Sequence, residues 1–372
     1  MKKIIFIDHE PYTKRRKQIF YIDELILNGF SVEVWDISSF LYPNITIVDS
    51  IYESYHRIIS SIDSFIECLD SCNIQNSIFV VECLPIWNNR RIFSELARRK
   101  CISVKIDFFA NTTIPEPQSN KFKRLFSNDC LNIIKRQLLN INYRLYKYIF
   151  NINEYDYVLS SSSISNRTHK INHPDYDVYR NTVPSRLFPH RYAVFCDNYF
   201  PYHPDLRSIF KVDNIPDGKA YQKSLNEFFS YIESKYNIPV VIAAHPKADY
   251  KGDEFDGRHI IKYETNNLVL FSDLVIMHSS NSISYVVLAD KPIVFITTDG
   301  YNSIKRFKIR MSVLASMFNK KVYNIDRHNY NEINMSKINK SARESYIYTY
   351  LTSLDTTSKT NLELLIDFFS KF

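Results

Sequence analysis

The chain has 372 residues, of which 45% are hydrophobic and 23% charged, and its formal net charge is +7 at pH 7. This composition is typical of a globular protein, and the length favours two domains because one core seldom serves so many residues. The charge excess is too small for a nucleic-acid binder, and no apolar run is long enough to span a bilayer.

Strand-like and helix-like segments alternate in the first half of the chain. Near-continuous apolar stretches predict strands at 2–8, 31–37, 77–84, 102–109 and 156–162. Apolar residues at helical spacing predict helices at 15–29, 52–72, 90–100 and 130–150. Buried strands separated by helices are typical of a parallel sheet that is covered on both faces.

A polar, proline-containing stretch at 172–191 predicts a domain boundary, after which the alternation resumes. The expected strands are 192–198, 239–244, 259–263, 273–277, 292–298 and 321–325, and the expected helices are 220–236, 268–271, 282–290, 340–353 and 358–371. We therefore predict an α/β protein with two Rossmann-like domains facing a central cleft. Their limits are 1–188 and 189–340, with the C-terminal helices at 341–372 packing back towards the first domain.

The N-terminus and the cysteines indicate a cytoplasmic protein. Asp8, His9 and Glu10 interrupt the first apolar stretch too early for a signal peptide, so this stretch is expected to be a strand. The six cysteines form no C-x-x-C pair, which argues against a zinc site or a disulfide framework. We expect free thiols and no cofactor.

Glycine is scarce, with five residues in the whole chain. Neither G-x-G-x-x-G nor the P-loop motif is present, which argues against kinases, P-loop ATPases and standard dinucleotide oxidoreductases. A phosphate group would have to be held by helix N-termini, hydroxyls or basic side chains.

Polar side chains recur after the predicted strands, where ligands bind in doubly wound sheets. His245 directly follows the strand 239–244, and Pro246 restrains it to an extended conformation. Its ring could donate to a phosphate oxygen, with Lys247 adding positive charge, or it could simply satisfy the loop backbone. His173 and His203 also precede prolines, but only His245 directly follows a buried strand.

A second phosphate-binding feature follows the strand 273–277. His278, Ser279, Ser280 and Ser282 precede a predicted helix, whose unsatisfied N–H groups carry partial positive charge. Helix capping alone would need one serine, so we interpret the cluster as an anion site. Glu264, at the end of another strand, could accept the hydroxyls of a ribose or could cap the next helix.

The segments HPK (245–247) and HSSNSISYVVLADKPI (278–293) resemble the nucleotide-sugar half of bacterial GT-B glycosyltransferases with an HP motif and a serine motif. These families include sialyltransferases, Kdo transferases of capsule synthesis and CDP-glycerol polymerases. The opening segment 6–25 is similar to glycosyltransferases of O-antigen and capsule gene clusters. The resemblance implies that His245, Ser279 and Ser280 contact the donor phosphate and that Glu264 holds the ribose. The acidic motif of the sialyltransferases has no clean match.

An inverting transfer then needs a base from the first domain. Asp8, His9 and Glu10 are the catalytic candidates, with Asp107 and Glu82 in reserve, while Asp197 is expected to line the donor side of the cleft. Asp175-Tyr176-Asp177 matches a metal-binding D-x-D pattern but lies in the predicted linker, so we predict no metal.

The sequence thus predicts an inverting, metal-independent glycosyltransferase of bacterial surface polysaccharide synthesis, with a CMP-sugar as the favoured donor and a glycan or lipid-linked glycan as acceptor. Transfer from CDP-glycerol, use of a UDP- or GDP-sugar, and a non-catalytic nucleotide-binding scaffold remain alternatives. The basic segment 121–147 is either a solvated helix face or a contact with an anionic membrane, at the inner face of the cell membrane. No nucleic-acid partner is expected.

Overall fold

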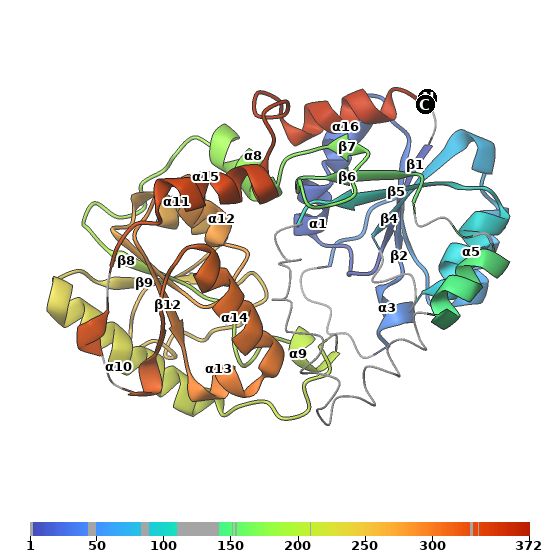
Figure 1. Cartoon of the computed structure of the whole chain (residues 1–372). Coiled ribbons are helices and arrows are strands. Elements are labelled where there is room, and N and C mark those ends of the chain that lie inside the picture. The colour runs from blue at the N-terminus through green and yellow to red at the C-terminus, as the bar shows by residue number, and fades with distance from the viewer. Residues whose placement is uncertain are drawn as a thin grey trace.

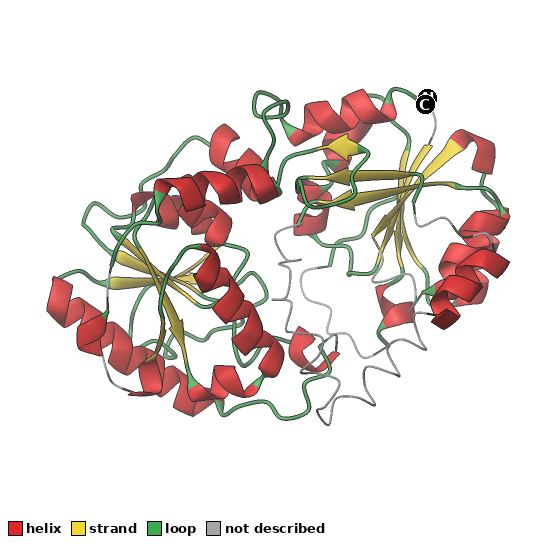
Figure 2. Cartoon of the chain, viewed as in Figure 1, coloured by secondary structure: helices red, strands yellow, loops and turns green. Residues whose placement is uncertain are grey.

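The computed structural model describes residues 3–43, 50–82, 89–109, 141–150, 152, 155–208, 210–327, 330–333 and 335–372. Within these ranges the chain forms two parallel β-sheets that lie side by side, each with its own helices (Figures 1 and 2). No helix in the described part of the chain is long and apolar enough to cross a membrane.

The first sheet has seven parallel strands in the order β3-β2-β1-β4-β5-β6-β7. Their bounds are β1 Lys3–Asp8, β2 Val32–Asp36, β3 His56–Ile58, β4 Ser77–Glu82, β5 Ile102–Asp107, β6 Tyr157–Ser160 and β7 His169–Lys170. The register of the central strands aligns Asp8 with Asp36 on one side and with Glu82 on the other. Three acidic residues therefore end adjacent strands at one edge of this sheet.

Alternating side chains of β1 divide the first core into two faces. Ile4 and Phe6 pack with the helices α1 (Lys14–Ile19), α2 (Ile22–Leu27) and α16 (Asn361–Phe369). Ile5 and Ile7 pack with α4 (Ile62–Asp70) and α5 (Arg90–Arg98). The sheet is covered on both faces, as its apolar strands require.

Local backbone features account for the differences from the predicted elements of this half. The single helix expected at 15–29 is divided at Tyr21, whose φ of 54° breaks the helical hydrogen-bond pattern. The helix expected at 52–72 is shortened to α4 by a capping box at Ser61, and residues before it form the edge strand β3. The short helix α3 (Ser38–Leu41) and the strand β7 were not predicted.

The second sheet has six parallel strands in the order β10-β9-β8-β11-β12-β13. Their bounds are β8 Ala193–Cys196, β9 Val240–Ala244, β10 Ile260–Lys262, β11 Leu274–Met277, β12 Ile293–Thr297 and β13 Val322–Asn324. The helices are α8 Pro174–Asn181, α9 Asp205–Ser208, α10 Gly218–Tyr236, α11 Thr265–Phe271, α12 Ile283–Leu288, α13 Asp299–Ser303, α14 Lys305–Met317 and α15 Lys340–Tyr346, which continues as a π-helix at Ile347–Leu351. All six predicted strands are present, whereas α8, α9, α13 and α14 were not predicted.

The segments between and after the two sheets connect both halves. Helix α8, within the predicted boundary segment, packs against α11 and α12 of the second half. Tyr346 and Leu351 belong to the second core, while Leu365 and Phe368 of α16 belong to the first (Figure 1). The predicted domain limits at 188 and 340 stay a prediction. Of the predicted helix 130–150, residues 141–149 are helical, and 130–140 lie outside the described residues.

Candidate functional site

Four adjacent strands of the second sheet end next to the residues that were predicted to bind a donor. Glu264, His245, Asp197 and Ser279 follow β10, β9, β8 and β11, which are neighbours in that order. Because the strands are parallel, these residues lie along one edge of the sheet, with neighbouring strands about 4.8 Å apart. Asp197 therefore lies between His245 and the serine loop, which is the loop of residues 278–282.

His245 presents a neutral imidazole with a defined tautomer. The backbone N–H of Lys247 donates to Nδ1 over 3.1 Å, so the ring proton is on Nε2. Burial, the neighbouring His203 ring and the positive charges of Arg15, Lys247 and Lys262 lower the pKa of His245 to about 2. Within the described residues Nε2 has no hydrogen-bond partner, so it can donate to a ligand oxygen.

His203 forms the same turn beside His245. The N–H of Asp205 donates to its Nδ1 over 3.2 Å, and the two imidazole centroids are 4.7 Å apart. Lys247 Nζ donates to Asp205 Oδ2 over 2.8 Å, which joins the two loops. Sequence reasoning did not select His203, although its His-Pro-Asp segment parallels His-Pro-Lys at 245–247.

Asp197 is a buried carboxylate that holds the loops around His245 in place. Its side chain is buried, Oδ1 accepts from the N–H of Tyr199 over 2.9 Å, and Oδ2 accepts from the hydroxyl of Tyr250 over 2.8 Å. Burial raises the pKa of Asp197 to about 6 although these bonds, and one from the backbone N–H of His245, oppose the shift. Asp197 positions the His245 loop, and both of its oxygens are already occupied.

His278 does not lie where a ligand could reach it. Its side chain is fully buried, Nε2 pairs with the hydroxyl of Tyr221 at 2.7 Å, and Nδ1 pairs with the carbonyl oxygen of Ile296 at 2.8 Å. Burial lowers its pKa to about 4 against that carbonyl contact, so the ring is neutral. Both ring nitrogens of His278 are therefore paired within the protein, and His278 supports the serine loop instead of contacting the donor.

The serines divide into one buried and two accessible residues. Ser279 is 7% exposed and its Oγ lies 2.8 Å from the hydroxyl of Tyr301. Ser280 and Ser282 are half-buried, with their Oγ atoms 3.3 Å apart. The helix α12 that follows has six residues, so its N-terminus adds little dipole. Ser280 and Ser282 are the hydroxyls that a ligand could reach.

Arg310 of α14 supplies a cation to the serine loop that sequence reasoning missed. Its Nη2 donates to Asn281 Oδ1 over 2.7 Å, while its buried Nε has no partner. No helix was predicted at 305–317, so nothing in the sequence indicated that Arg310 reaches this loop. A prediction of its position would have required the packing of α14.

Glu264 is the N-cap residue of α11, yet its side chain makes no capping bond. Oε2 instead accepts from Asn267 Nδ2 over 2.8 Å, and Asn267 Oδ1 accepts from the N–H of Ser185. The half-buried carboxylate is thus oriented by Asn267, and its contact with a ribose stays a prediction.

At the edge of the first sheet, Asp8 is occupied by protein contacts. It is 2% exposed, Oδ2 accepts from Arg16 Nε over 2.6 Å, and Oδ1 accepts from the N–H of Glu10 over 3.0 Å. Burial raises the pKa of Asp8, and the charge of Arg16 only partly offsets it. Asp8 therefore positions its neighbours and does not itself offer a free oxygen.

His9 and Glu10 are the accessible members of the predicted catalytic group. His9 Nδ1 contacts the carbonyl oxygen of Glu82, so the ring proton is on Nδ1 and the lone pair is on Nε2. Nε2 lies 3.9 Å from Glu10 Oε1, and the Glu10 side chain is 37% exposed. Desolvation opposes ionisation of Glu10, but its neighbours, first Arg16 and then His9 and Lys247, outweigh it and lower the pKa of Glu10 to about 2.

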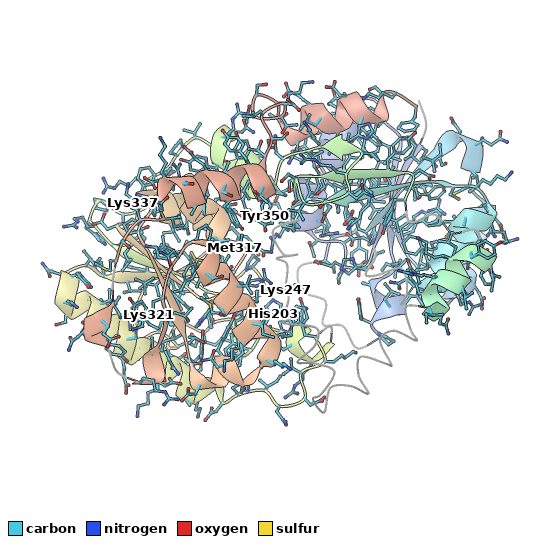
Figure 3. All side chains as sticks on the ribbon, in the orientation of Figure 1. His203, Lys247, Met317, Lys321, Lys337 and Tyr350 are labelled. Atoms are coloured by element: carbon cyan, nitrogen blue, oxygen red, sulfur yellow. The ribbon has the colours of Figure 1, made fainter. Side chains whose placement is uncertain are left out.

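Charges of the two halves act on each other across the edges of the two sheets. Glu10 of the first half is stabilised by Lys247 of the second, and Arg15 acts on His245. We call Glu10, Arg15, His203, His245 and Lys247 the facing cluster. In Figure 3, His203 and Lys247 lie on the side of the second half that faces the first.

The reserve and metal candidates are occupied by the protein itself. Glu82 Oε1 accepts from the N–H of Ile106 over 3.0 Å, and Asp107 accepts from Ser160. Of the D-x-D pair, Asp177 caps α16 through the N–H of Asn361 and also accepts from the Tyr21 hydroxyl. In the described ranges, no group of three or more His, Cys, Asp or Glu residues could hold a metal ion.

A hollow of about 290 Å³ adjoins the His245 loop. Its lining comes from the residues that follow the loop and from β10, namely Ala248, Asp249, Tyr250, Lys251, Gly252, Ile260 and Lys262. A larger depression of about 650 Å³ lies along α10 and residues 253–256, and no residue of the facing cluster lines it. All residues that line the smaller hollow lie between His245 and Glu264 in the sequence.

No protein-family model matches the sequence, and no curated protein is a detectable relative. Among solved structures, a variant of the wall teichoic acid polymerase TagF soaked with CDPG aligns with a TM-score of 0.50 and 13% identity, over 99% of this chain and 88% of that chain. The glycotransferase of kitacinnamycin aligns with a TM-score of 0.49 and 10% identity over 98% of both chains. At these identities the comparison shows the fold alone. The chain has the two-sheet α/β architecture of GT-B proteins.

Proposed function

We propose that the protein is an inverting, metal-independent glycosyltransferase that moves a sugar from a nucleotide donor, favouring a CMP-sugar, to a glycan of bacterial surface polysaccharide. The observation that carries the proposal is the facing cluster, in which a neutral imidazole donor of the second sheet faces ionisable groups of the first. A GT-B fold alone would not select this chemistry, because one fold supports many functions.

The donor is held at the edge of the second sheet. His245 Nε2–H donates to a phosphate oxygen, and Ser280, Ser282 and Arg310 add hydroxyl and cationic contacts from the serine loop. Glu264 accepts from the ribose hydroxyls. A neutral donor in a half-buried site loses less hydration than an imidazolium would, so it binds an anion without first having to be protonated.

The acceptor is activated by His9. Its Nε2 lone pair takes the proton of the acceptor hydroxyl as oxygen attacks the anomeric carbon from the face opposite the leaving phosphate. The bond between the anomeric carbon and the phosphate oxygen breaks, and its electron pair stays on that oxygen. Because attack comes from the opposite face, the anomeric configuration is inverted. The imidazolium formed is flanked by Glu10 Oε1 at 3.9 Å and Asp8 Oδ1 at 3.7 Å, which balance its charge.

The leaving nucleotide carries negative charge that cations must balance. Arg310, Lys247 and Arg15 are the side chains that the fold brings towards this edge. Fixed cations and donors stabilise charge that develops in a transition state without reorganising, which is how we propose that the enzyme acts without a metal.

Donor turnover tests the function directly. Purified protein is incubated with CMP-sugars, UDP-sugars, GDP-sugars and CDP-glycerol, each with and without glycan acceptors, and released nucleotide is measured by chromatography. CDP-glycerol belongs in the panel because the structure with the TM-score of 0.50 was soaked with CDPG. Release of CMP that depends on acceptor is expected. Nucleotide binding without turnover of any donor would instead identify a non-catalytic scaffold.

The phosphate contact is tested with His245→Ala. Loss of one donor to a charged oxygen is expected to weaken CMP binding by about 10- to 100-fold, measured by calorimetry. His190→Ala is the matched control, because His190 is exposed and outside the facing cluster. Equal affinities of the two variants would remove His245 from the site.

A further inference from the structure

The described part of the long basic segment is a helix with an unusual surface. Residues 141–149 are helical, and four apolar side chains on them face solvent: Ile141 is 54% exposed, Leu145 56%, Tyr148 87% and Ile149 70%. Their successive spacings of four, three and one residues put them on one side of a helix. We call these four residues the apolar stripe.

The opposite side of the same helix is packed against the first half. Tyr143 and Tyr146 join the core under α4 and α5, Arg90 of α5 lies 5.0 Å over the Tyr146 ring, and it donates to Asn142 Oδ1 over 3.0 Å. In Figures 1 and 2 this helix lies beside α5 at the outer side of the first half. The helix is therefore fixed with the apolar stripe pointing outward, away from the second half.

Basic side chains accompany the apolar stripe. Arg144 is exposed and flanks the apolar stripe at one edge of the helix face, and Arg91 is exposed on the neighbouring α5. No carboxylate in the described residues pairs with either guanidinium, and residues 141–150 contain no acid. An exposed apolar surface with unpaired cations beside it matches the boundary of an anionic bilayer, where acyl chains meet acidic headgroups.

We propose that the apolar stripe, with Arg91 and Arg144, docks the protein on an anionic lipid surface. A helix of this length lies in the plane of the interface and does not cross it. A second copy of the chain is a poorer occupant, because a symmetric contact would bring the arginines of both copies together without acids to neutralise them. Docking places the first half, where the acceptor is proposed to bind, at the membrane.

Sedimentation with vesicles tests the proposal. Wild-type protein is expected to bind vesicles of equal parts phosphatidylcholine and phosphatidylglycerol, and not pure phosphatidylcholine. The triple variant Leu145→Ser, Tyr148→Ser, Ile149→Ser should lower the partition coefficient at least about a hundredfold, because each side chain loses its apolar burial in the bilayer. Arg91→Gln with Arg144→Gln should lower it roughly thirtyfold, at about 1 kcal/mol per charge.

Matched controls alter equally exposed residues elsewhere. Leu27→Ser changes an 84% exposed leucine of α2, and Lys223→Gln with Lys340→Gln removes two charges whose side chains are 77% and 84% exposed. These controls are expected to bind as wild type does. The proposal is overturned if wild type ignores the anionic vesicles, if the controls lose as much binding as the test variants, or if sedimentation shows a dimer that the triple variant dissociates. Donor turnover in solution does not depend on any of these outcomes.

Discussion

Each His-Pro pair of this chain forms one and the same turn, in which the N–H two residues after the histidine donates to Nδ1. Proline fixes its own backbone and holds the histidine extended, so the ring folds over the following peptide. The turn fixes the tautomer before any ligand arrives. At His173 the ring is buried under α8, whereas at His203 and His245 it lies in the facing cluster. The His-Pro dipeptide therefore determines the local turn, whereas its position in the fold determines whether the ring can meet a ligand.

The contact between His9 and the carbonyl of Glu82 leads to a prediction for catalysis. His9→Gln should lower kcat by about 10²- to 10⁴-fold, because general-base catalysis is lost, while the Kd for the donor nucleotide changes little. Steady-state kinetics and calorimetry separate the two effects. A variant that keeps wild-type kcat would show that the base lies elsewhere.

Asp197 predicts a pH dependence of stability. Its pKa is about 6 in the folded protein against 3.8 ordinarily, so the folded state holds this proton more tightly than the unfolded chain. The resulting stabilisation is present below about pH 4 and is lost as pH rises to about 6, by at most about 3 kcal/mol. The Asp197→Asn variant has no titratable group at this position, so its stability lacks this pH-dependent contribution.

Urea denaturation of both proteins between these pH values measures the effect. The free energy of unfolding of wild type, relative to Asp197→Asn, should fall as pH rises through the window and level off above it. A constant difference would show that Asp197 titrates normally.

Elements whose position depends on local pattern were predictable, and elements whose position depends on packing were not. The strands that precede Asp8, His245 and Ser279 are continuous apolar runs ending in polar residues, and the structure has them as predicted. The division of α1 from α2 depends on Tyr21, whose hydroxyl binds Asp177 more than a hundred residues away. A contact between residues so far apart produces no periodic pattern in the sequence. The contact of Arg310 in α14 with Asn281 is unpredictable for the same reason.

The C-terminal helix α16 gives a test at the scale of elements. Leu365 is fully buried in the core of the first sheet, although it lies near the end of the chain. Leu365→Ala should lower the free energy of unfolding by about 2–5 kcal/mol through lost burial and a cavity. Leu354→Ala, which changes a leucine 77% exposed, should cost less than about 0.5 kcal/mol. Equal stability of the two variants would mean that α16 is not packed on the first core.

At the scale of the whole molecule, two parallel sheets present ionisable residues to each other. The two-sheet fold followed from the alternation of elements, and most predicted site residues do follow strand ends at facing edges. The sequence could not distinguish the accessible Ser280 and Glu10 from the occupied His278 and Asp8. That distinction depends on the contacts of His278 with Tyr221 and of Asp8 with Arg16. Residue type and strand order locate a site, whereas the contacts of each side chain decide its chemistry.

We propose above that a nucleotide phosphate binds at the carboxyl edge of the second sheet. A crystal structure of the protein with bound CMP, or with the nucleotide that binds best, would locate that phosphate. We expect a phosphate oxygen about 2.7–3.2 Å from His245 Nε2, with Ser280 and Arg310 beside it. A nucleotide bound along α10, with His245 Nε2 left in water, would contradict it.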